Sequence, residues 1–294
     1  SYATFAEAQG AASAYQGGFP ACIGGVFYAR IGNYTTREKA VEAQAALASQ
    51  GVEASLKGTT EYGISVVITG TNTILFQYDD LGQGTGLGME ANAGGPGEYV
   101  TLSKRCTYVG GFRFERVSGG SLTVVNLLDF EDYIKGVVPH EMSNSWPIEA
   151  LKAQAVAARS YALSLGSKHS KYHFDICAET HCQAYSGRTR AGSNSDAAVD
   201  QTAGQVAMWN GKIAQTAYYS SNGGASESSS TVWGSNQANY PYLVGKADPY
   251  EAASGVQNDY TKTVDSATLA SKLKAAGCDV GGGVASIAVT SLTD

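Results

Sequence analysis

The beginning of the chain contains short runs of apolar residues and, between them, one pattern typical of a helix. Residues 26–31 have the composition of a strand. A helix is predicted next, because Thr35 and Glu38 have the spacing of a capping box and Gly51 stands where a left-handed C-cap residue belongs. The segments EYGISVVITG and NTILFQYDD predict two more strands. Residues 20–80 are therefore expected to form a small β-α-β-β module.

A glycine-rich segment at 81–98 follows this module and is expected to be a linker or loop. It lacks the G-x-G-x-x-G of dinucleotide-binding proteins, because Leu87 stands where the third glycine is needed. From Tyr99 onward, short apolar runs predict two or three antiparallel strands with a turn at Gly119 and Gly120.

The longest helical pattern follows Trp146, where apolar or small residues recur every three to four positions. Pro147 suits the first turn of a helix, and Glu149 complements its positive end. The alanine-rich face permits close packing, so this helix is expected to be buried. Gln154 and Arg159 must then find polar partners, because a buried amide or guanidinium without hydrogen bonds is costly. The patterns together predict an α+β fold, with mixed or antiparallel sheets and packed helices.

Composition and charge narrow the class of protein. The chain has 294 residues, of which 43% are hydrophobic and 16% charged, so it can bury a substantial core in one or two domains. The net charge is −6 and the basic residues are scattered, so the sequence offers no basic patch that would attract nucleic acid or an anionic membrane. No run of eighteen apolar residues occurs, so no membrane-spanning segment is expected. The abundance of Gly, Tyr, Ser, Thr and Asn is typical of exported bacterial proteins.

Glu141 is the candidate for acid chemistry, because it lies among apolar residues shortly before the predicted helix. A carboxylic acid in a partly apolar pocket can protonate the leaving oxygen of a glycosidic bond. An ordinary solvated glutamate is the alternative from the residues alone. A zinc protease is excluded, because H-E-x-x-H would need histidine in place of Asn144, and the G-x-S-x-G elbow of serine hydrolases does not occur.

Three separated motifs resemble one known family. They are GVVPHEMSNSWPIEALKAQAVAARSYAL at 136–163, DICAETHCQAYSG at 175–187 and AYYSSNGGASESSSTVWGSNQANYPYLVGKADPYE at 217–251. The three motifs, in this order, resemble those of the stage II sporulation protein D family, which includes the amidase enhancers. The resemblance implies that 99–294 is a lytic transglycosylase domain acting on peptidoglycan. The end of the chain, VASIAVTSLTD, reads as a strand where related proteins usually continue into further strands.

By this resemblance Glu141 is the catalytic acid and base. Its carboxyl group would protonate the glycosidic oxygen between MurNAc and GlcNAc and then deprotonate the muramyl C6 hydroxyl, which leaves a 1,6-anhydroMurNAc end on a strand denuded of stem peptides. This scheme requires no catalytic cofactor and no second carboxylate. A hydrolysing glycosidase and a non-catalytic wall-binding enhancer of an amidase remain alternatives. The neighbouring acids are expected to be structural: Asp129, Glu131, Asp132 and Glu149.

Other residues in these motifs are expected to bind substrate. Gln154 and Arg159 would line or support the glycan groove, with a satisfied internal network as the equal alternative. A polar, glycine-containing turn suits a groove wall beside a sugar, and it comprises Ser220, Ser221, Asn222, Gly223 and Gly224. The aromatic residues nearby either stack on sugars or belong to the core: Tyr218, Tyr219, Trp233 and Tyr242.

A group of histidine and cysteine residues offers a structural zinc site. His173, Cys177 and Cys182 resemble the one histidine and two cysteines through which some family members hold zinc, and His181 is close in sequence. A disulfide between Cys177 and Cys182 is the competing interpretation, since an exported protein permits one. Ligand spacing does not decide between them.

The N-terminal module has a fainter resemblance of its own. YARIGNYTTREKAVEAQAALASQGVEA resembles the first half of a sporulation-related repeat domain, which binds denuded glycan strands. A generic α/β unit is the alternative. The two resemblances imply an exported protein at the cell wall or the extracellular face of the membrane, or in the compartment that engulfs a forespore. Its expected partners are peptidoglycan glycan strands and a cell-wall amidase.

Overall fold

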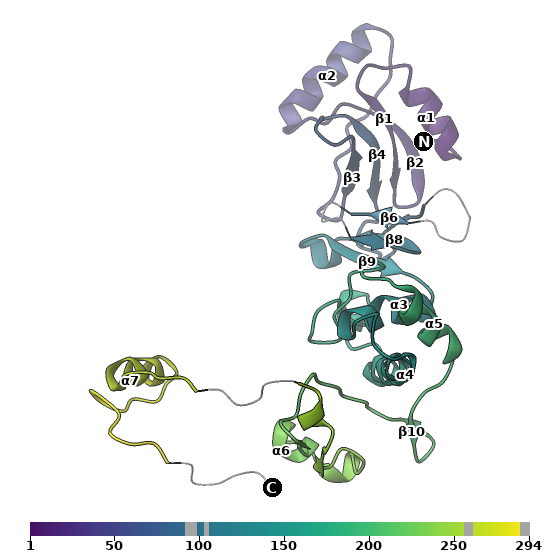
Figure 1. Cartoon of the computed structure of the whole chain (residues 1–294). Coiled ribbons are helices and arrows are strands. Elements are labelled where there is room, and N and C mark those ends of the chain that lie inside the picture. The colour runs from purple at the N-terminus through teal and green to yellow at the C-terminus, as the bar shows by residue number, and fades with distance from the viewer. Residues whose placement is uncertain (92–98, 103–105, 256–260, 289–294) are drawn as a thin grey trace. The chain divides into compact units, whose positions relative to one another are not determined.

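The computed structural model describes residues 1–91, 99–102, 106–255 and 261–288 (Figure 1). The chain divides into two compact units, Ser1–Thr216 and Ala217–Asp294. Helices alternate with small mixed and antiparallel sheets, so the predicted α+β class is confirmed. The boundary between these compact units lies after Thr216 and not in the glycine-rich segment. A compact unit need not coincide with a functional domain, so the predicted domain limits stay a prediction.

A four-stranded sheet with the order β2-β1-β4-β3 forms the N-terminal part of the first unit. Its strands are β1 (Gly18–Ile23), β2 (Val26–Ile31), β3 (Ile64–Val67) and β4 (Ile74–Asp79), and the last three confirm the sequence prediction. The sequence pattern misses β1, which lies in the middle of the sheet, antiparallel to β2 and parallel to β4. This strand contains Pro20, which lacks an N–H and counts against a strand interior. The register with β4 begins only at Ala21, so the proline needs no partner on that side.

Two helices accompany the sheet, α1 (Phe5–Ala12) and α2 (Arg37–Ser49). The ring of Phe5 packs edge-on against Phe76 of β4, with centroids 5.5 Å apart. Helix α2 confirms the predicted helix, but its N-cap is Thr36 and not Thr35. Gly51 has a φ of +76°, as expected for a left-handed residue after a helix.

Short strands from the middle of the chain form two small antiparallel sheets. One has the order β5-β8-β9, and the other pairs β6 with β7. Their bounds are β5 (Leu87–Met89), β6 (Val100–Thr101), β7 (Thr107–Tyr108), β8 (Gly111–Glu115) and β9 (Thr123–Leu127). The expected turn between β8 and β9 contains a short helix, η1 (Val117–Gly119). Strand β5 lies inside the expected linker, of which 92–98 fall outside the described residues.

Three helices build the core of the first unit: α3 (Phe130–Glu141), α4 (Ile148–Leu165) and α5 (Ser193–Gln201). Helix α4 is the helix predicted after Trp146. The sequence pattern misses α3, because Gly136 and Pro139 both disfavour a helix interior. Gly136 has a tertiary reason, since a Cβ there would lie 2.4 Å from the ring of Tyr185. Apolar side chains of α3, α4 and α5 fill the space between them without exposure to solvent: Ile134, Val137, Val138, Leu151, Ala155, Ala158, Ala198 and Val199.

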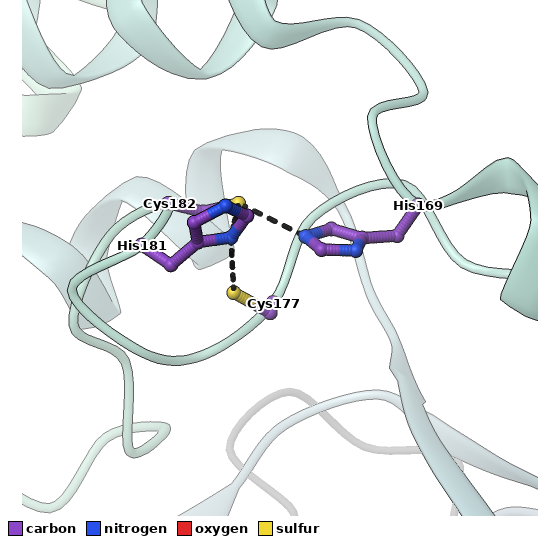
Figure 2. A group of neighbouring side chains, drawn as sticks. All are labelled: His169, Cys177, His181 and Cys182. Carbon is purple, nitrogen blue, oxygen red and sulfur yellow. Dashed lines mark hydrogen bonds between the residues drawn. The ribbon is translucent and has the colours of Figure 1, made fainter.

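The connection from α4 to α5 has little regular structure beyond the short helix η2 (Ser170–Tyr172). It folds back so that four side chains come together: His169, Cys177, His181 and Cys182 (Figure 2). After α5, the hairpin of β10 (Met208–Trp209) and β11 (Lys212–Ile213) follows.

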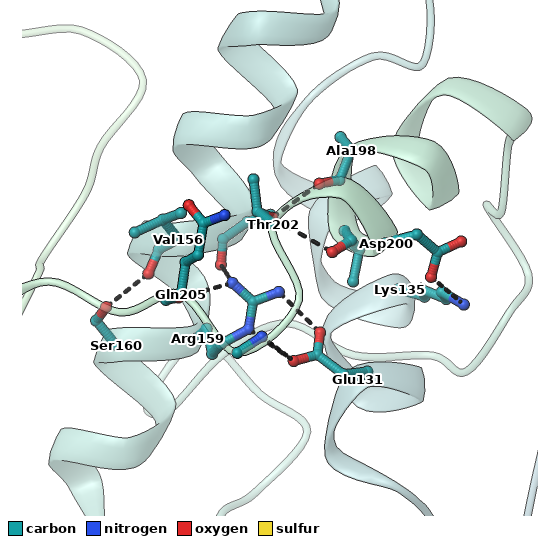
Figure 3. A network of polar contacts seen from close by, with 12 residues as sticks. Glu131, Lys135, Val156, Arg159, Ser160, Ala198, Asp200, Thr202 and Gln205 are labelled. Carbon is teal, nitrogen blue, oxygen red and sulfur yellow. Dashed lines mark hydrogen bonds and ion pairs between the residues drawn. The ribbon is translucent and has the colours of Figure 1, made fainter.

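An ion pair between a buried guanidinium and a half-buried carboxylate joins α3 to α4 (Figure 3). The guanidinium of Arg159, which is 1% exposed, donates to both carboxylate oxygens of Glu131 at 2.9 and 2.7 Å. It also donates to the backbone carbonyl of Gln205 at 2.9 Å, and the backbone N–H of Gly204 donates to Glu131 at 3.1 Å. The pair therefore holds two helices and the segment after α5 in one arrangement.

The second unit contains a small sheet and several short helices. Its elements are β12 (Ala225–Ser226), α6 (Ser229–Trp233), η3 (Gln237–Asn239), β13 (Lys246–Ala247), η4 (Glu251–Ala253) and α7 (Ser266–Ala275). The predicted final strand is wrong for 284–288, which have no regular structure, and 289–294 lie outside the described residues. Within the described part of the chain, no helix combines the length and apolar character needed to cross a bilayer.

Replacing Arg159 tests the ion pair. Arg159→Ala is expected to lower the free energy of unfolding by about 2 kcal/mol, because it leaves the half-buried Glu131 carboxylate without its charge partner and the carbonyl of Gln205 without its donor. The matched control is Lys152→Ala, which removes an exposed pair with Glu149 and should cost less than about 1 kcal/mol. Urea denaturation measures both. An unchanged unfolding midpoint for Arg159→Ala would instead support the substrate-binding role predicted from the sequence.

Candidate functional site

Glu141 is the last residue of α3, and its side chain is exposed. The helix ends there because the backbone N–H of Met142 makes the last helical bond, to the carbonyl of Val138, while Met142 itself adopts an extended conformation. The carboxyl group thus stands at the surface on a helix whose other side is buried. This placement leaves Glu141 open to solvent.

The loop after Glu141 is fixed by Asn144. Its side-chain oxygen accepts a hydrogen bond from the backbone N–H of Ser195 at 2.8 Å, so it caps the first turn of α5. Its carbonyl accepts a second bond from the side chain of Asn194 at 3.0 Å. A Cβ at Gly192 would lie 2.2 Å from the Asn144 side chain, so the contact requires glycine there. The sequence analysis used Asn144 only to exclude a zinc protease and misses this role.

His140 precedes the acid and is half-buried. Its Nε2 lies 2.5 Å from the hydroxyl of Ser186. Burial, with a further contribution from the positive charge of Arg190, lowers the pKa of His140, so the imidazole is neutral at neutral pH. The pair connects the end of α3 to the end of the second motif, residues 175–187, which also carries Cys177, His181 and Cys182.

Glu131, near the start of α3, is held in its charged form. Burial favours the neutral form of Glu131, but hydrogen bonds from Arg159 and Gly204 outweigh it and hold the pKa of Glu131 below its ordinary value. Glu131 is therefore a structural ion-pair partner, as expected from the sequence. Because Arg159 makes its bonds inside the protein, the geometry favours the internal-network interpretation of this residue over the groove interpretation. Gln154 is 6% exposed within the same helix.

The polar turn of the third motif lies in the second unit, where it is bonded to a later segment of the same unit. The hydroxyl of Ser221 donates to Glu251 at 2.5 Å, and the side-chain amide of Asn222 donates to Asp248 at 2.9 Å. Gly223 and Gly224 have φ values of +69° and +107°, which only glycine adopts without strain. The structure thus brings the five predicted wall residues together as one turn and adds two carboxylates that the sequence analysis did not consider.

The cysteine and histidine cluster differs from the predicted ligand set. Each of His169, Cys177, His181 and Cys182 offers one ligand atom, and these atoms lie within 4.8 Å of one another. His173 is not a member, which corrects the prediction: its Nδ1 lies 2.6 Å from the buried carboxylate of Glu115. His169 takes the expected place of a histidine ligand because the chain folds back between α4 and α5.

The geometry of the cluster suits a tetrahedral metal ion. The Cys182 sulfur lies 3.4 Å from His169 Nε2 and 3.9 Å from His181 Nδ1, and the Cys177 sulfur lies 3.7 Å from His181 Nδ1. Donors about 2.0–2.3 Å from a tetrahedral zinc ion would be about 3.3–3.8 Å apart. Burial, helped by nearby positive groups, lowers the pKa of His169 and so favours the neutral imidazole that a metal needs. Both cysteines are free thiols in the structure.

Comparison with known proteins matches the part of the chain that carries this geometry. The sequence model of the family SpoIID, stage II sporulation protein, matches residues 118–209. An uncharacterized protein of Brachyspira hyodysenteriae is 44% identical over 126 residues, which are 42% of this chain and 33% of the relative. The amidase enhancer of Bacillus subtilis is 43% identical over 122 residues, which are 42% of this chain and 16% of the relative.

A third relative is matched over a longer segment. Stage II sporulation protein D of Bacillus subtilis is 28% identical over 165 residues, which are 51% of this chain and 47% of the relative. The chain thus spans less than half of the length of each of these three relatives. Helices α3 and α4, which carry Glu141 and Arg159, and the loop with Asn144 between them lie within the matched family segment. Within residues 118–209 the chain is therefore similar to the family of stage II sporulation protein D and the amidase enhancers.

Proposed function

We propose that this protein is a lytic transglycosylase that cleaves denuded peptidoglycan strands between MurNAc and GlcNAc and leaves 1,6-anhydroMurNAc ends. Glu141 is the acid and base of the reaction. The observation that carries the proposal is the position of this carboxyl group, exposed at the end of a buried helix and inside the segment that matches the family.

The end of α3 suits a residue that delivers a proton. The C-terminal carbonyl groups of a helix carry partial negative charge, so an added negative charge is least stabilised there. Glu131, one turn into the same helix, shows the opposite environment, because Arg159 compensates its charge. A proton donor at Glu141 and a fixed carboxylate at Glu131 are therefore consistent with the different surroundings of the two acids.

The reaction requires only one carboxyl group, which acts in sequence. The protonated Glu141 gives its proton to the glycosidic oxygen as the bond to C1 of the muramyl residue breaks. The resulting carboxylate then takes the proton of the C6 hydroxyl, whose oxygen forms the new bond to C1. The Glu141 carboxyl is thereby returned to its starting state, and Asn144 keeps the loop behind it attached to α5.

Structural zinc at His169, Cys177, His181 and Cys182 is the second part of the proposal. Two thiols and two imidazoles form a closed ligand set, and such a set suits a structural rather than a catalytic metal. The cluster crosslinks the otherwise irregular connection between α4 and α5. Burial raises the pKa of the Cys182 thiol, so a positive metal ion would be needed to hold it as thiolate.

The names of the relatives support a place in the cell wall and leave a second function open. One relative is named an amidase enhancer, and it matches the chain over the segment of Glu141. An exported wall-binding protein that assists an amidase without cleaving glycan is therefore the alternative. The N-terminal sheet is proposed as a glycan-binding module in either case. In a transglycosylase, binding and cleavage would then act on the same strands.

The products made from denuded glycan strands distinguish the two functions. Wild-type protein is expected to release strands with 1,6-anhydroMurNAc ends, and Glu141→Gln, which keeps shape and loses the acid, is expected to lower kcat by at least about 100-fold. Mass spectrometry identifies the ends. Glu149→Gln, on the exposed first turn of α4, is the matched control and should retain activity. Reducing ends would indicate hydrolysis, and binding without cleavage by the wild type would indicate the enhancer.

Removal of zinc tests the cluster independently of activity. Protein purified without chelator is expected to contain about one zinc ion per chain by atomic emission. Chelation, or Cys177→Ser with His169→Ala, should lower Tm by about 5–10 °C, since a tightly bound ion stabilises the folded state by a few kcal/mol. Cys22→Ser, outside the cluster, is the control. A Cys177–Cys182 disulfide in the peptide map, with Tm insensitive to chelation, would reject the zinc site.

A further inference from the structure

Tyr250 is the most exposed large side chain among the apolar and aromatic residues that the structure describes, with 81% of its surface accessible. Single exposed aromatic rings are common at protein surfaces, so a role for this one has to be argued from the groups around it. The ring belongs to the second unit, in the segment between β13 and η4. The sequence analysis considered other aromatic residues of this unit and not this one.

Two carboxylates, on either side of Tyr250, fix its backbone to the polar turn. The backbone N–H of Tyr250 donates to Asp248 at 3.0 Å, and the other oxygen of the same carboxylate accepts from Asn222 at 2.9 Å. Glu251 accepts from the hydroxyl of Ser221 at 2.5 Å. The exposed ring is therefore mounted on a hydrogen-bonded frame and does not lie on a free loop.

These hydrogen bonds indicate that the side chains of the polar turn support the structure, whereas the sequence predicted that they contact a sugar. Asn222 donates to Asp248, and its side-chain oxygen accepts from the backbone N–H of Gly224 at 2.8 Å. These side chains hold the frame. The turn offers open space instead, because no heavy atom lies within 4 Å of the position of a Cβ on Gly223 or Gly224. The backbone N–H of Asp248 donates to the carbonyl of Gly224 at 2.7 Å, so the segment that carries Tyr250 is bonded directly to this open turn. An aromatic ring and backbone polar groups on neighbouring segments are the kinds of group that contact sugars.

The charges of the frame select among sugars. Asp248 and Glu251 are acidic residues two positions before and one position after Tyr250, and Lys246 is the one basic residue among residues 246–255. The lactyl carboxylate of a muramyl residue stacked on Tyr250 would meet like charges at short range, whereas an N-acetylglucosamine residue carries no charge. The geometry favours the uncharged ring.

We propose that Tyr250 is a stacking platform for an uncharged N-acetylhexosamine ring, held in place by Asp248 and Glu251 as positioning residues. This inference rests on the proposed function, because it assumes that the chain takes a glycan. It assigns the contact to the aromatic ring and gives Ser221 and Asn222 the role of supports.

The test is a calorimetric titration of the full chain with N-acetylglucosamine oligosaccharides from chitin. All proteins carry Glu141→Gln, so that the ligand is not consumed. Adding Tyr250→Ala is expected to raise Kd about tenfold, while Tyr250→Phe and Tyr250→Trp, which keep an aromatic face, stay within about twofold. Trp209→Ala, which removes an exposed aromatic residue of the first unit, is the matched control and should leave Kd unchanged.

The frame is tested by Glu251→Ala, which should raise Kd although the ring remains, and by Glu251→Gln, which keeps an acceptor for Ser221 and should recover most of the affinity. Equal Kd values for Tyr250→Ala and its parent would overturn the platform. Binding of muramyl-containing strands through Tyr250, without binding of the chitin oligosaccharides, would overturn the uncharged ring. Tyr250-dependent binding by a chain whose Glu141 form cleaves nothing would reject the transglycosylase and keep the platform.

Discussion

The ion pair between Arg159 and Glu131 is the interaction on which the arrangement of the helical core depends. A charged pair in this position contributes less through its energy than through the single arrangement it permits, because any shift of α3 along α4 would leave a buried charge without its partner. The alanine-lined contact between the helices has no such selectivity of its own. The pair therefore sets the position of α3, and the direction of Glu141 at its end follows from it.

Local patterns in the sequence predict the elements that local interactions determine. Helix α4 has a clear period, and β2, β3 and β4 have apolar runs with turn residues between them. The pattern misses β1 and α3, because Pro20, Gly136 and Pro139 count against regular structure in any scheme based on propensity. Their reasons are tertiary: the ring of Tyr185 occupies the space beside Gly136, and β1 receives its second neighbour only after Pro20.

The residues of the candidate site also differ in how well the sequence predicts them, because some belong to contiguous motifs and others meet only in the folded chain. The motif around Glu141 is contiguous, so the sequence alone can nominate this residue as the candidate acid, and its role stays a prediction. The ligand cluster is only half predictable, since His169 and His173 are both histidines near Cys177 and only the path of the chain separates them. Asn144 and Asp248 had no recognisable signal, because their partners, Ser195 and Asn222, are 51 and 26 residues distant in the sequence.

The parallel pairing of β1 with β4 has a consequence for the order of events in folding. Ala21 pairs with Gln77, so the central strand of the N-terminal sheet has a complete set of neighbours only after some fifty further residues have been synthesised. Until then the β1–β2 hairpin presents an open edge, which is a template for pairing with another chain. Such distant contacts also form slowly. Residues 18–23 are therefore a part of the N-terminal sheet where pairing with another chain competes with folding until β4 has been synthesised.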